Sequence, residues 1–301
     1  MDKPAQGRGA AVPVAVAALA IGLFSTMDAI MKGLSLAIGA YNALLWRTLA
    51  GALLGGLVFL ARRQAWPERS VMRVHLMRGI LSSVMAILFF WGLARVPMAQ
   101  AIALAFIAPI ISLYLAAVFL KETIERSAIL ASLLGFAGVV VILSGQAGAE
   151  LGPEALVGSL AILASACLYA GNIVLMRRQA QMAGPVEVAF FISAIMTSCF
   201  LFASPFLAAW PEAEHWPAIL GGALLAFASL MLFAWAYARA EAQHLAPVEY
   251  SGFIWAAAFG WLFFAEPVRP FTIVGAAMIV AACLIAARPR PGAAAHAEGA
   301  M

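Results

Sequence analysis

The chain is a succession of long apolar runs separated by short clusters of proline, glycine and charged residues. A bilayer core of roughly 30 Å needs about 20 apolar residues in helical form, and most of the runs approach this length. Cutting the sequence at the polar clusters predicts ten transmembrane helices, at about 12–35, 40–61, 71–94, 97–120, 127–144, 156–180, 185–208, 217–239, 244–265 and 269–287. The connections are short, so the pattern leaves no room for a separate soluble domain.

The pattern repeats after 144 residues, about half the chain. Six residues recur at this spacing: Phe89, Trp91, Ala94, Arg95, Phe119 and Glu122 return as Phe233, Trp235, Ala238, Arg239, Phe263 and Glu266. At the same spacing Asp28 corresponds to Asn172, and each is a polar residue inside an apolar run. Because each half has five predicted crossings, an odd number, the second half must enter the bilayer upside down relative to the first, as in many secondary transporters.

We therefore expect an all-α polytopic membrane protein whose ten transmembrane helices form two inverted five-helix repeats around a central cavity. Its predicted parts are a disordered cytoplasmic N-terminus (1–11), the first repeat (12–144), an external linker (145–155), the second repeat (156–287) and a disordered cytoplasmic tail (288–301).

Composition agrees with a chain that lies in lipid. Hydrophobic residues make up 65% and charged residues 11%, whereas charged residues alone approach a quarter of a soluble domain. The formal net charge of +4 and the pI of about 9.2 raise the question of nucleic-acid binding, but the basic residues lie between helices rather than in one patch, which argues against a nucleic-acid partner.

The basic residues instead predict the orientation of the chain. With a cytoplasmic N-terminus, the inner helix ends collect Lys3, Arg8, Arg62, Arg63, Arg69, Arg73, Lys121, Arg126, Arg177, Arg178, Arg239, Arg288 and Arg290. The outer ends collect only Lys32, Arg95 and Arg269. Loops rich in lysine and arginine stay on the cytoplasmic side, so we expect both termini in the cytoplasm of a bacterial cell, with the protein in the inner membrane.

Two stretches carry a family resemblance: ARVPMAQAIALAFIAPIISLYLAAVFLKETI (94–124) and its echo ARAEAQHLAPVEYSGFIWAAAFGWLFFAEPV (238–268). In each, a helix ends with an acidic residue, Glu122 or Glu266, and a hydrophilic or proline turn follows. This pattern resembles the drug/metabolite transporter superfamily, in its ten-helix EamA-type branch, and in particular bacterial amino-acid exporters. The resemblance covers nearly the whole chain and implies export of small metabolites without a cofactor, while its motifs specify the substrate only weakly.

Several ionisable residues fall inside the predicted helices, where each costs roughly 2.5–3.5 kcal/mol unless it faces a cavity or a partner. Asp28 and Lys32 are four residues apart and are expected to pair on one helix face. Such a pair would fix the helix near its outer end. Alternatively, Asp28 lies in the substrate or ion pathway, with Asn172 as its counterpart in the second half.

The second and third predicted helices add further candidates. On the second, Arg47 can clamp a carboxylate through two hydrogen bonds, and Trp46 offers an aromatic face for an ammonium group; alternatively, Arg47 bonds a neighbouring helix and Trp46 faces lipid. On the third, Arg78 either lines an entrance or reaches lipid phosphate, with Ser82 on the same face. His75 is expected at the membrane interface; alternatively, it takes part in a proton relay.

Pro109 and Pro247 fall within or near bilayer depth, where a missing backbone hydrogen bond favours a bend beside a cavity. Both are hinge candidates. Glu249 follows Pro247 closely, so stabilisation at a helix N-terminus is an alternative to a role in binding. The complete set of candidate cavity residues is Asp28, Asn42, Trp46, Arg47, Arg78, Ser82, Trp91, Tyr169, Asn172, Phe190, Trp235, Glu249 and Tyr250.

These features favour a secondary-active or facilitative transporter that exports small amphipathic metabolites, most simply amino acids including apolar or aromatic ones, by alternating access. A multidrug or other metabolite exporter of the same fold is the alternative. An intramembrane enzyme is a remote one, since no H-E-x-x-H, G-x-S-x-G or paired-aspartate motif is present. We expect no metal, catalytic residue or cofactor. The expected partners are a small-molecule substrate, the bilayer, and a proton or other coupling ion; the oligomeric state is left open.

Overall fold

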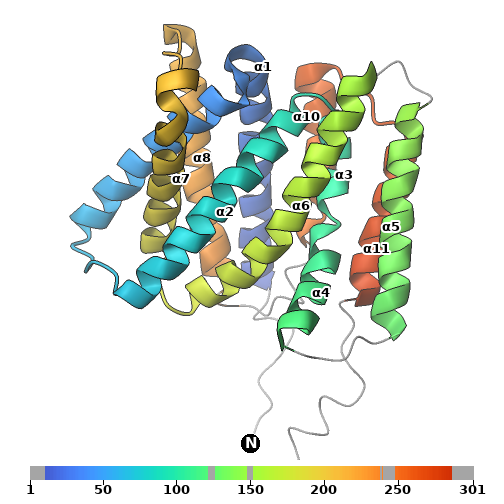
Figure 1. The fold of residues 1–301 in the computed structure, drawn as a ribbon, viewed down its shortest axis with the longest axis horizontal. Helices are drawn as coiled ribbons and strands as arrows, with labels where there is room; N and C mark the ends of the chain where they lie inside the picture. The colour runs from blue at the N-terminus through green and yellow to red at the C-terminus, as the bar shows by residue number, and fades with distance from the viewer. Residues whose placement is uncertain (1–10, 121–125, 148–151, 238, 240–247, 287–301) are drawn as a thin grey trace, which may run out of the picture.

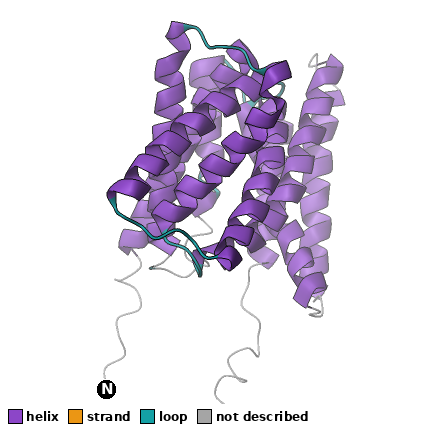
Figure 2. Ribbon diagram, turned by 60° about the vertical axis from the view of Figure 1, so that its left-hand side comes forward, coloured by secondary structure: helices purple, strands orange, loops and turns teal. Residues whose placement is uncertain are grey.

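The computed structural model describes residues 11–120, 126–147, 152–237, 239 and 248–286, and this part of the chain is all-α (Figures 1 and 2). Its helices are α1 (Ala11–Ala61), α2 (Arg69–Leu93), α3 (Met98–Ala105), α4 (Ala108–Leu120), α5 (Arg126–Ala147), α6 (Gly152–Ala180), α7 (Pro185–Leu207), the short 3-10 helix η1 (Ala213–His215), α8 (Trp216–Tyr237), α10 (Gly252–Phe264) and α11 (Pro270–Ala286). The termini and Pro247 lie outside the described residues.

Two predicted helix boundaries depend on local backbone chemistry. α1 contains the first two predicted helices, which meet at Gly39, where φ is 78°. This left-handed conformation suits glycine because it has no Cβ. The fourth predicted helix is interrupted between α3 and α4, at Phe106 and Ile107, and Pro109 is the second residue of α4. A proline fits the first turn of α4, where its missing N–H leaves no bond unmade.

Among the described residues, five helices are long and apolar enough to cross a membrane: Val12–Ala61, which is bent at Gly39, Arg69–Leu93, Pro153–Met176, Pro185–Leu207 and Ala213–Ala236. Shorter apolar helices span Met98–Ser112, Ser132–Gly145, Gly252–Phe264 and Pro270–Ile285. The all-α membrane architecture is thus confirmed, while the count of ten crossings stays a prediction.

The helices run up and down between two ends of one bundle (Figure 1). α1 begins and α11 ends at what we call the lower end, and the bend at Gly39 lies at the upper end. The part of α1 before Gly39 therefore runs upward, whereas α6, its equivalent after a shift of 144 residues, runs from the upper to the lower end. Equivalent helices of the two halves therefore point in opposite directions.

A repeated local contact agrees with this inversion. At the end of α2, the Arg95 guanidinium lies 3.6 Å from the Trp91 ring centroid and donates to the Trp91 carbonyl at 3.0 Å. At the end of α8, Arg239 lies 4.2 Å from the Trp235 ring and donates to the Trp235 carbonyl at 3.2 Å. The two pairs are 144 residues apart in sequence and lie at opposite ends of the bundle, as inverted repeats require.

Helix packing follows the same symmetry. α1 packs on α8 and α2 packs on α6, so that the first helix of each half meets the third of the other. α5 and α11, the last helices of the two halves, pack on each other through small residues. A Cβ at Gly135 would lie 3.5 Å from Ala282, and one at Gly138 would lie 2.8 Å from Ile279. A shift of 144 residues exchanges these two contacts, so the α5–α11 interface carries the repeat symmetry.

We predict that Gly138→Ala destabilises the protein by about 1–3 kcal/mol through overpacking. The added Cβ would lie 2.7 Å from the Gly275 carbonyl oxygen, a backbone atom that cannot move away by rotation. Gly171→Ala is the matched control, because its Cβ would meet only Leu81, at 3.8 Å. There the lower conformational entropy of alanine should stabilise the helix by about 0.5–1 kcal/mol. Thermal unfolding in detergent should separate the two variants; equal melting temperatures would contradict this packing.

Candidate functional site

Buried polar side chains gather where the two repeats meet, in three groups. The first, which we call the upper cluster, joins α1, the turn before α3 and the end of α10. Lys32 on α1 donates to the Val96 carbonyl at 2.7 Å and forms an ion pair with Glu266. The second Glu266 oxygen accepts the Met98 N–H at 2.8 Å. One carboxylate therefore links both halves of the chain at the upper end.

The turn after α10 places Glu266 for these bonds. Ala265 adopts a left-handed conformation with φ of 53°, and the Glu266 N–H bonds back to the Gly260 carbonyl at 3.0 Å, an arrangement typical of a helix C-terminus. A pocket of about 330 Å³ adjoins the cluster. It is lined by Lys32, Leu36, Ala94, Arg95, Val96, Pro97, Phe264, Ala265, Glu266, Pro267 and Arg269.

The expected pairing of Asp28 with Lys32 is wrong. The Lys32 side chain extends to the upper end, where Glu266 supplies the opposite charge and two backbone groups complete the bonding. Asp28 remains 2% exposed, and its Oδ1 has no hydrogen-bond partner within the described residues. A spacing of four residues allows Asp28 and Lys32 to pair on one helix face. Lys32 instead pairs with Glu266, which follows α10.

The second group consists of Asp28 and Arg47, which lie on either side of the bend in α1 and within range of each other's charge. The Nε atom of Arg47 is also buried and lacks a hydrogen-bond partner in the part of the chain that the structure describes. Gly222 of α8 lies against the arginine, since a Cβ there would be in van der Waals contact with Arg47 Cδ, at 3.7 Å. Each member of the Asp28–Arg47 pair thus keeps unused hydrogen-bonding capacity in a buried position.

The third group, which we call the lower cluster, joins α2 to α6 and α7. Arg78 donates from Nε to the Asn172 side-chain oxygen at 3.2 Å and from Nη1 to the Gln179 side-chain oxygen. Ser82 donates to the same Asn172 oxygen at 3.4 Å. The remaining members of the lower cluster are His75 and Glu187, whose Nε2 and Oε1 atoms are 2.9 Å apart. The cluster is a continuous chain of polar contacts between the two repeats.

His75 was expected at the interface but is fully buried, and its ring stacks on Phe191 at 4.8 Å. The importance of Gln179 was missed altogether. A signal was present, because Gln179 follows Asn172 by two helical turns and so lies on the same face of α6. Arg78 is 6% exposed and bonded to protein, so the alternative in which it reaches lipid phosphate is wrong.

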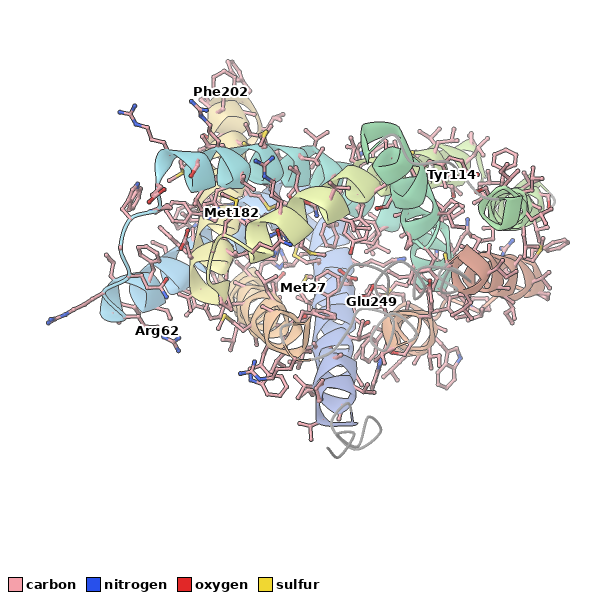
Figure 3. All side chains as sticks on the ribbon, turned by 90° about the horizontal axis from the view of Figure 1, so that it is seen from below. Met27, Arg62, Tyr114, Met182, Phe202 and Glu249 are labelled. Atoms are coloured by element: carbon pink, nitrogen blue, oxygen red, sulfur yellow. The ribbon has the colours of Figure 1, made fainter. Side chains whose placement is uncertain are left out.

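Two tyrosines and Glu249 continue the polar surface. Tyr169 lies within range of the charges of both Arg78 and Glu249. Tyr250 also interacts with Glu249, and its ring meets Phe106 edge to face at 5.2 Å. Figure 3 shows Glu249 and Met27 toward the middle of the bundle, whereas Arg62 and Phe202 point outward. Arg78, Tyr169, Asn172, Glu249 and Tyr250 are therefore brought together from α2, α6 and the segment before α10.

Five predicted cavity residues have packing contacts elsewhere. The side-chain oxygen of Asn42 accepts the Ala209 N–H at 2.9 Å, and Trp46 donates to the Ala209 carbonyl at 2.9 Å. Both residues thus hold the segment after α7. Phe190 stacks on Phe59 at 5.3 Å. Trp91 and Trp235 carry the arginine contacts described above.

Pro109 adjoins the interruption between α3 and α4. Pro247 lies outside the described residues. A hinge function for either residue stays a prediction.

Comparison with known proteins places this arrangement in context. The EamA-like transporter family model matches residues 12–144 and 156–288, once per repeat. The chain is 28% identical over 287 residues to the pseudopaline exporter CntI of Pseudomonas aeruginosa, covering 93% of this chain and 97% of that protein. It is 27% identical over 228 residues to a riboflavin transporter of Brucella anthropi, covering 73% and 78%. It is also 27% identical over 175 residues to the aromatic amino acid exporter YddG of Ancylobacter novellus, covering 57% and 58%.

Proposed function

The chain belongs to the EamA-like transporter family, and on that premise we propose that it exports a small amphipathic metabolite with both a carboxylate and an ammonium group. An apolar or aromatic amino acid is the simplest such compound. The chain is a multi-pass membrane transporter of a small molecule, not an enzyme. The excess of basic residues at the lower end supports a cytoplasmic position for that end, and the bacterial relatives support a location in the inner membrane.

The observation that carries this proposal is the Asp28–Arg47 pair. Both side chains retain buried hydrogen-bonding atoms without partners among the described residues. A carboxylate entering beside Arg47 can accept two parallel hydrogen bonds from the guanidinium. An ammonium group beside Asp28 can donate to the free carboxylate oxygen. A zwitterion would therefore satisfy both groups at once, whereas a neutral sugar would leave both charges unsatisfied.

The upper and lower clusters support alternating access. Each joins the first repeat to the second, and they lie at opposite ends of the bundle. Opening one end while the other stays bonded would expose the Asp28–Arg47 region to one side at a time. The two ends are not equivalent, because the position of Lys32 in the first repeat is held by Met176 in the second. We therefore expect the upper end to be the more firmly closed of the two.

Counterflow in liposomes tests this proposal. Vesicles loaded with an unlabelled compound should accumulate the same compound in labelled form when the carrier exchanges it. We expect exchange of phenylalanine or leucine by purified, monodisperse protein, and none of sucrose. Protein-free vesicles correct for leakage. Exchange of riboflavin or of a cationic dye, without exchange of any amino acid, would replace the proposed substrate class; exchange of none of these compounds would remove the proposal.

A further inference from the structure

Gln179 lies between His75 and Arg78 of the lower cluster, and its amide group meets one with its nitrogen and the other with its oxygen. Its nitrogen is 2.5 Å from His75 Nδ1, and its oxygen accepts a hydrogen bond from Arg78. Gln179 is 1% exposed, His75 is fully buried and Arg78 is 6% exposed. No water shell is therefore available to separate the three groups.

The arginine determines the orientation of this amide. A guanidinium group can only donate hydrogen bonds, so the group of Gln179 that faces Arg78 must be the oxygen. The Gln179 NH₂ group then points to His75 and donates to Nδ1. Nδ1 must consequently be unprotonated, and the ring proton is on Nε2, which donates to Glu187 Oε1 at 2.9 Å. His75 is thus held as the neutral Nε2–H tautomer.

A second proton on His75 is incompatible with this arrangement. It would set an N–H at Nδ1 against the N–H of Gln179, two donors at hydrogen-bond distance. Reversing the amide would relieve that contact but would turn its NH₂ group toward Arg78, again donor against donor. Protonation of His75 and the bond between Arg78 and Gln179 therefore exclude each other. Arg78 would keep only its longer bond to Asn172, at 3.2 Å.

We infer that His75 is the binding site for a coupling proton, and that proton binding releases α2 from α6 at the lower end. This inference rests on the proposed transport function and adds its coupling ion. The lower end, where substrate loads, opens when His75 holds a proton and closes again when that proton leaves. Inward movement of protons would thereby be exchanged for outward movement of substrate.

Charged and polar groups from α2, α6 and α7 surround His75. Glu187 of α7 contacts the ring and supplies the counter-charge, and its side chain is 16% exposed, which brings solvent to the cluster. Arg78 on α2 acts through Gln179 of α6, and Tyr169 of α6 lies within range of the Arg78 charge. Phe191 covers one face of the imidazole. From the described residues of α1 and α3, no ionisable group forms a hydrogen bond or ion pair with His75.

The test measures the separation of α2 and α6 without any substrate. Spin labels at Arg69→Cys and Met182→Cys, both exposed positions at the lower end, are introduced after replacement of Cys167, Cys199 and Cys283. Distances are measured in nanodiscs from about pH 8 to pH 5, the range in which imidazole groups ordinarily gain a proton. We expect a short distance at high pH and a longer one at low pH.

Two variants separate the coupling role from a merely structural one. His75→Gln can accept from Gln179 and donate to Glu187 but cannot titrate, so the short distance should persist at every pH. Gln179→Glu provides a carboxylate that can accept from both Arg78 and a protonated His75, so it should also lose the pH response and stay closed. Gel filtration verifies folding.

The inference is overturned if the parent shows no change with pH, if His75→Gln responds as the parent does, or if either variant is open at all pH values. Counterflow tests the transport proposal separately, since the distance measurement needs no transported compound.

Discussion

Glu266→Gln is expected to weaken the closed upper end by about 3 kcal/mol, because it leaves the Lys32 ammonium buried without a counter-charge. The Lys32 side chain is only 3% exposed, and Glu266 is its ion-pair partner. Loss of one partner of a buried pair typically costs about 3–5 kcal/mol, and we expect the lower value because the adjacent pocket admits water. The substitution keeps the size of the side chain and an oxygen acceptor, so its effect reports the charge.

This difference is large enough to change the population of closed molecules about 100-fold. The measurement is the labelling rate of a single cysteine at Leu36, which lines the upper pocket, with a maleimide that cannot cross the membrane. We expect faster labelling and a lower melting temperature in Glu266→Gln than in the parent.

A double variant provides the control. Lys32→Met introduces the residue that the second repeat has at the equivalent position, Met176. In Lys32→Met/Glu266→Gln no unpaired charge remains, so stability should recover although the ion pair is absent. If Glu266→Gln alone labels and melts like the parent, the ion pair does not hold the upper end closed.

The course of the helices could be predicted from sequence because it depends on local properties. The predicted helix at 185–208 corresponds to α7, Pro185–Leu207, and the predicted helix at 71–94 corresponds to α2, Arg69–Leu93. Apolar length and the polar clusters between runs determine both helices. The repeat was also visible, because positions such as Trp91 and Trp235 retain the same residue after duplication.

The partners of the polar residues could not be predicted in the same way. Lys32 bonds to Glu266, which is 234 residues away, and Asp28, the only acidic residue within its own helical turn, is not its partner. Helical spacing identifies which residues can meet within one helix, but not which helix lies opposite. His75 illustrates the same point: it is close to the start of α2, yet Phe191 and Gln179 cover it from α7 and α6.

The two repeats have also diverged where the site is. Arg47 corresponds to Phe191 and Arg78 to Gly222 after a shift of 144 residues. In the structure Gly222 lies against Arg47. One arginine thus comes from the second crossing and the other from the third, beside Asp28 and Asn172 respectively. The 144-residue spacing in the sequence relates Asp28 to Asn172. Which arginine lies beside each of them follows only from the packing of the helices.

Arg47→Met is expected to reduce counterflow of phenylalanine by about 10- to 100-fold at low substrate concentration. It removes the charged donor that we assign to the substrate carboxylate, and a hydrogen bond to a charged group contributes about 1.5–3 kcal/mol. Arg47→Lys keeps the charge without the fork of parallel donors and should recover only part of the rate. Initial rates in liposomes with equal amounts of incorporated protein provide the comparison.

Asp28→Asn distinguishes binding from a purely structural role of the pair. Arg47→Met alone leaves Asp28 buried beside no positive charge, which should lower the melting temperature as well as transport. Adding Asp28→Asn removes that unpaired charge, so the double variant should regain stability. Its counterflow should nevertheless stay at or below the level of Arg47→Met, because neither substrate charge then has a partner. Recovery of both stability and transport in the double variant would show that the pair only holds α1 in shape.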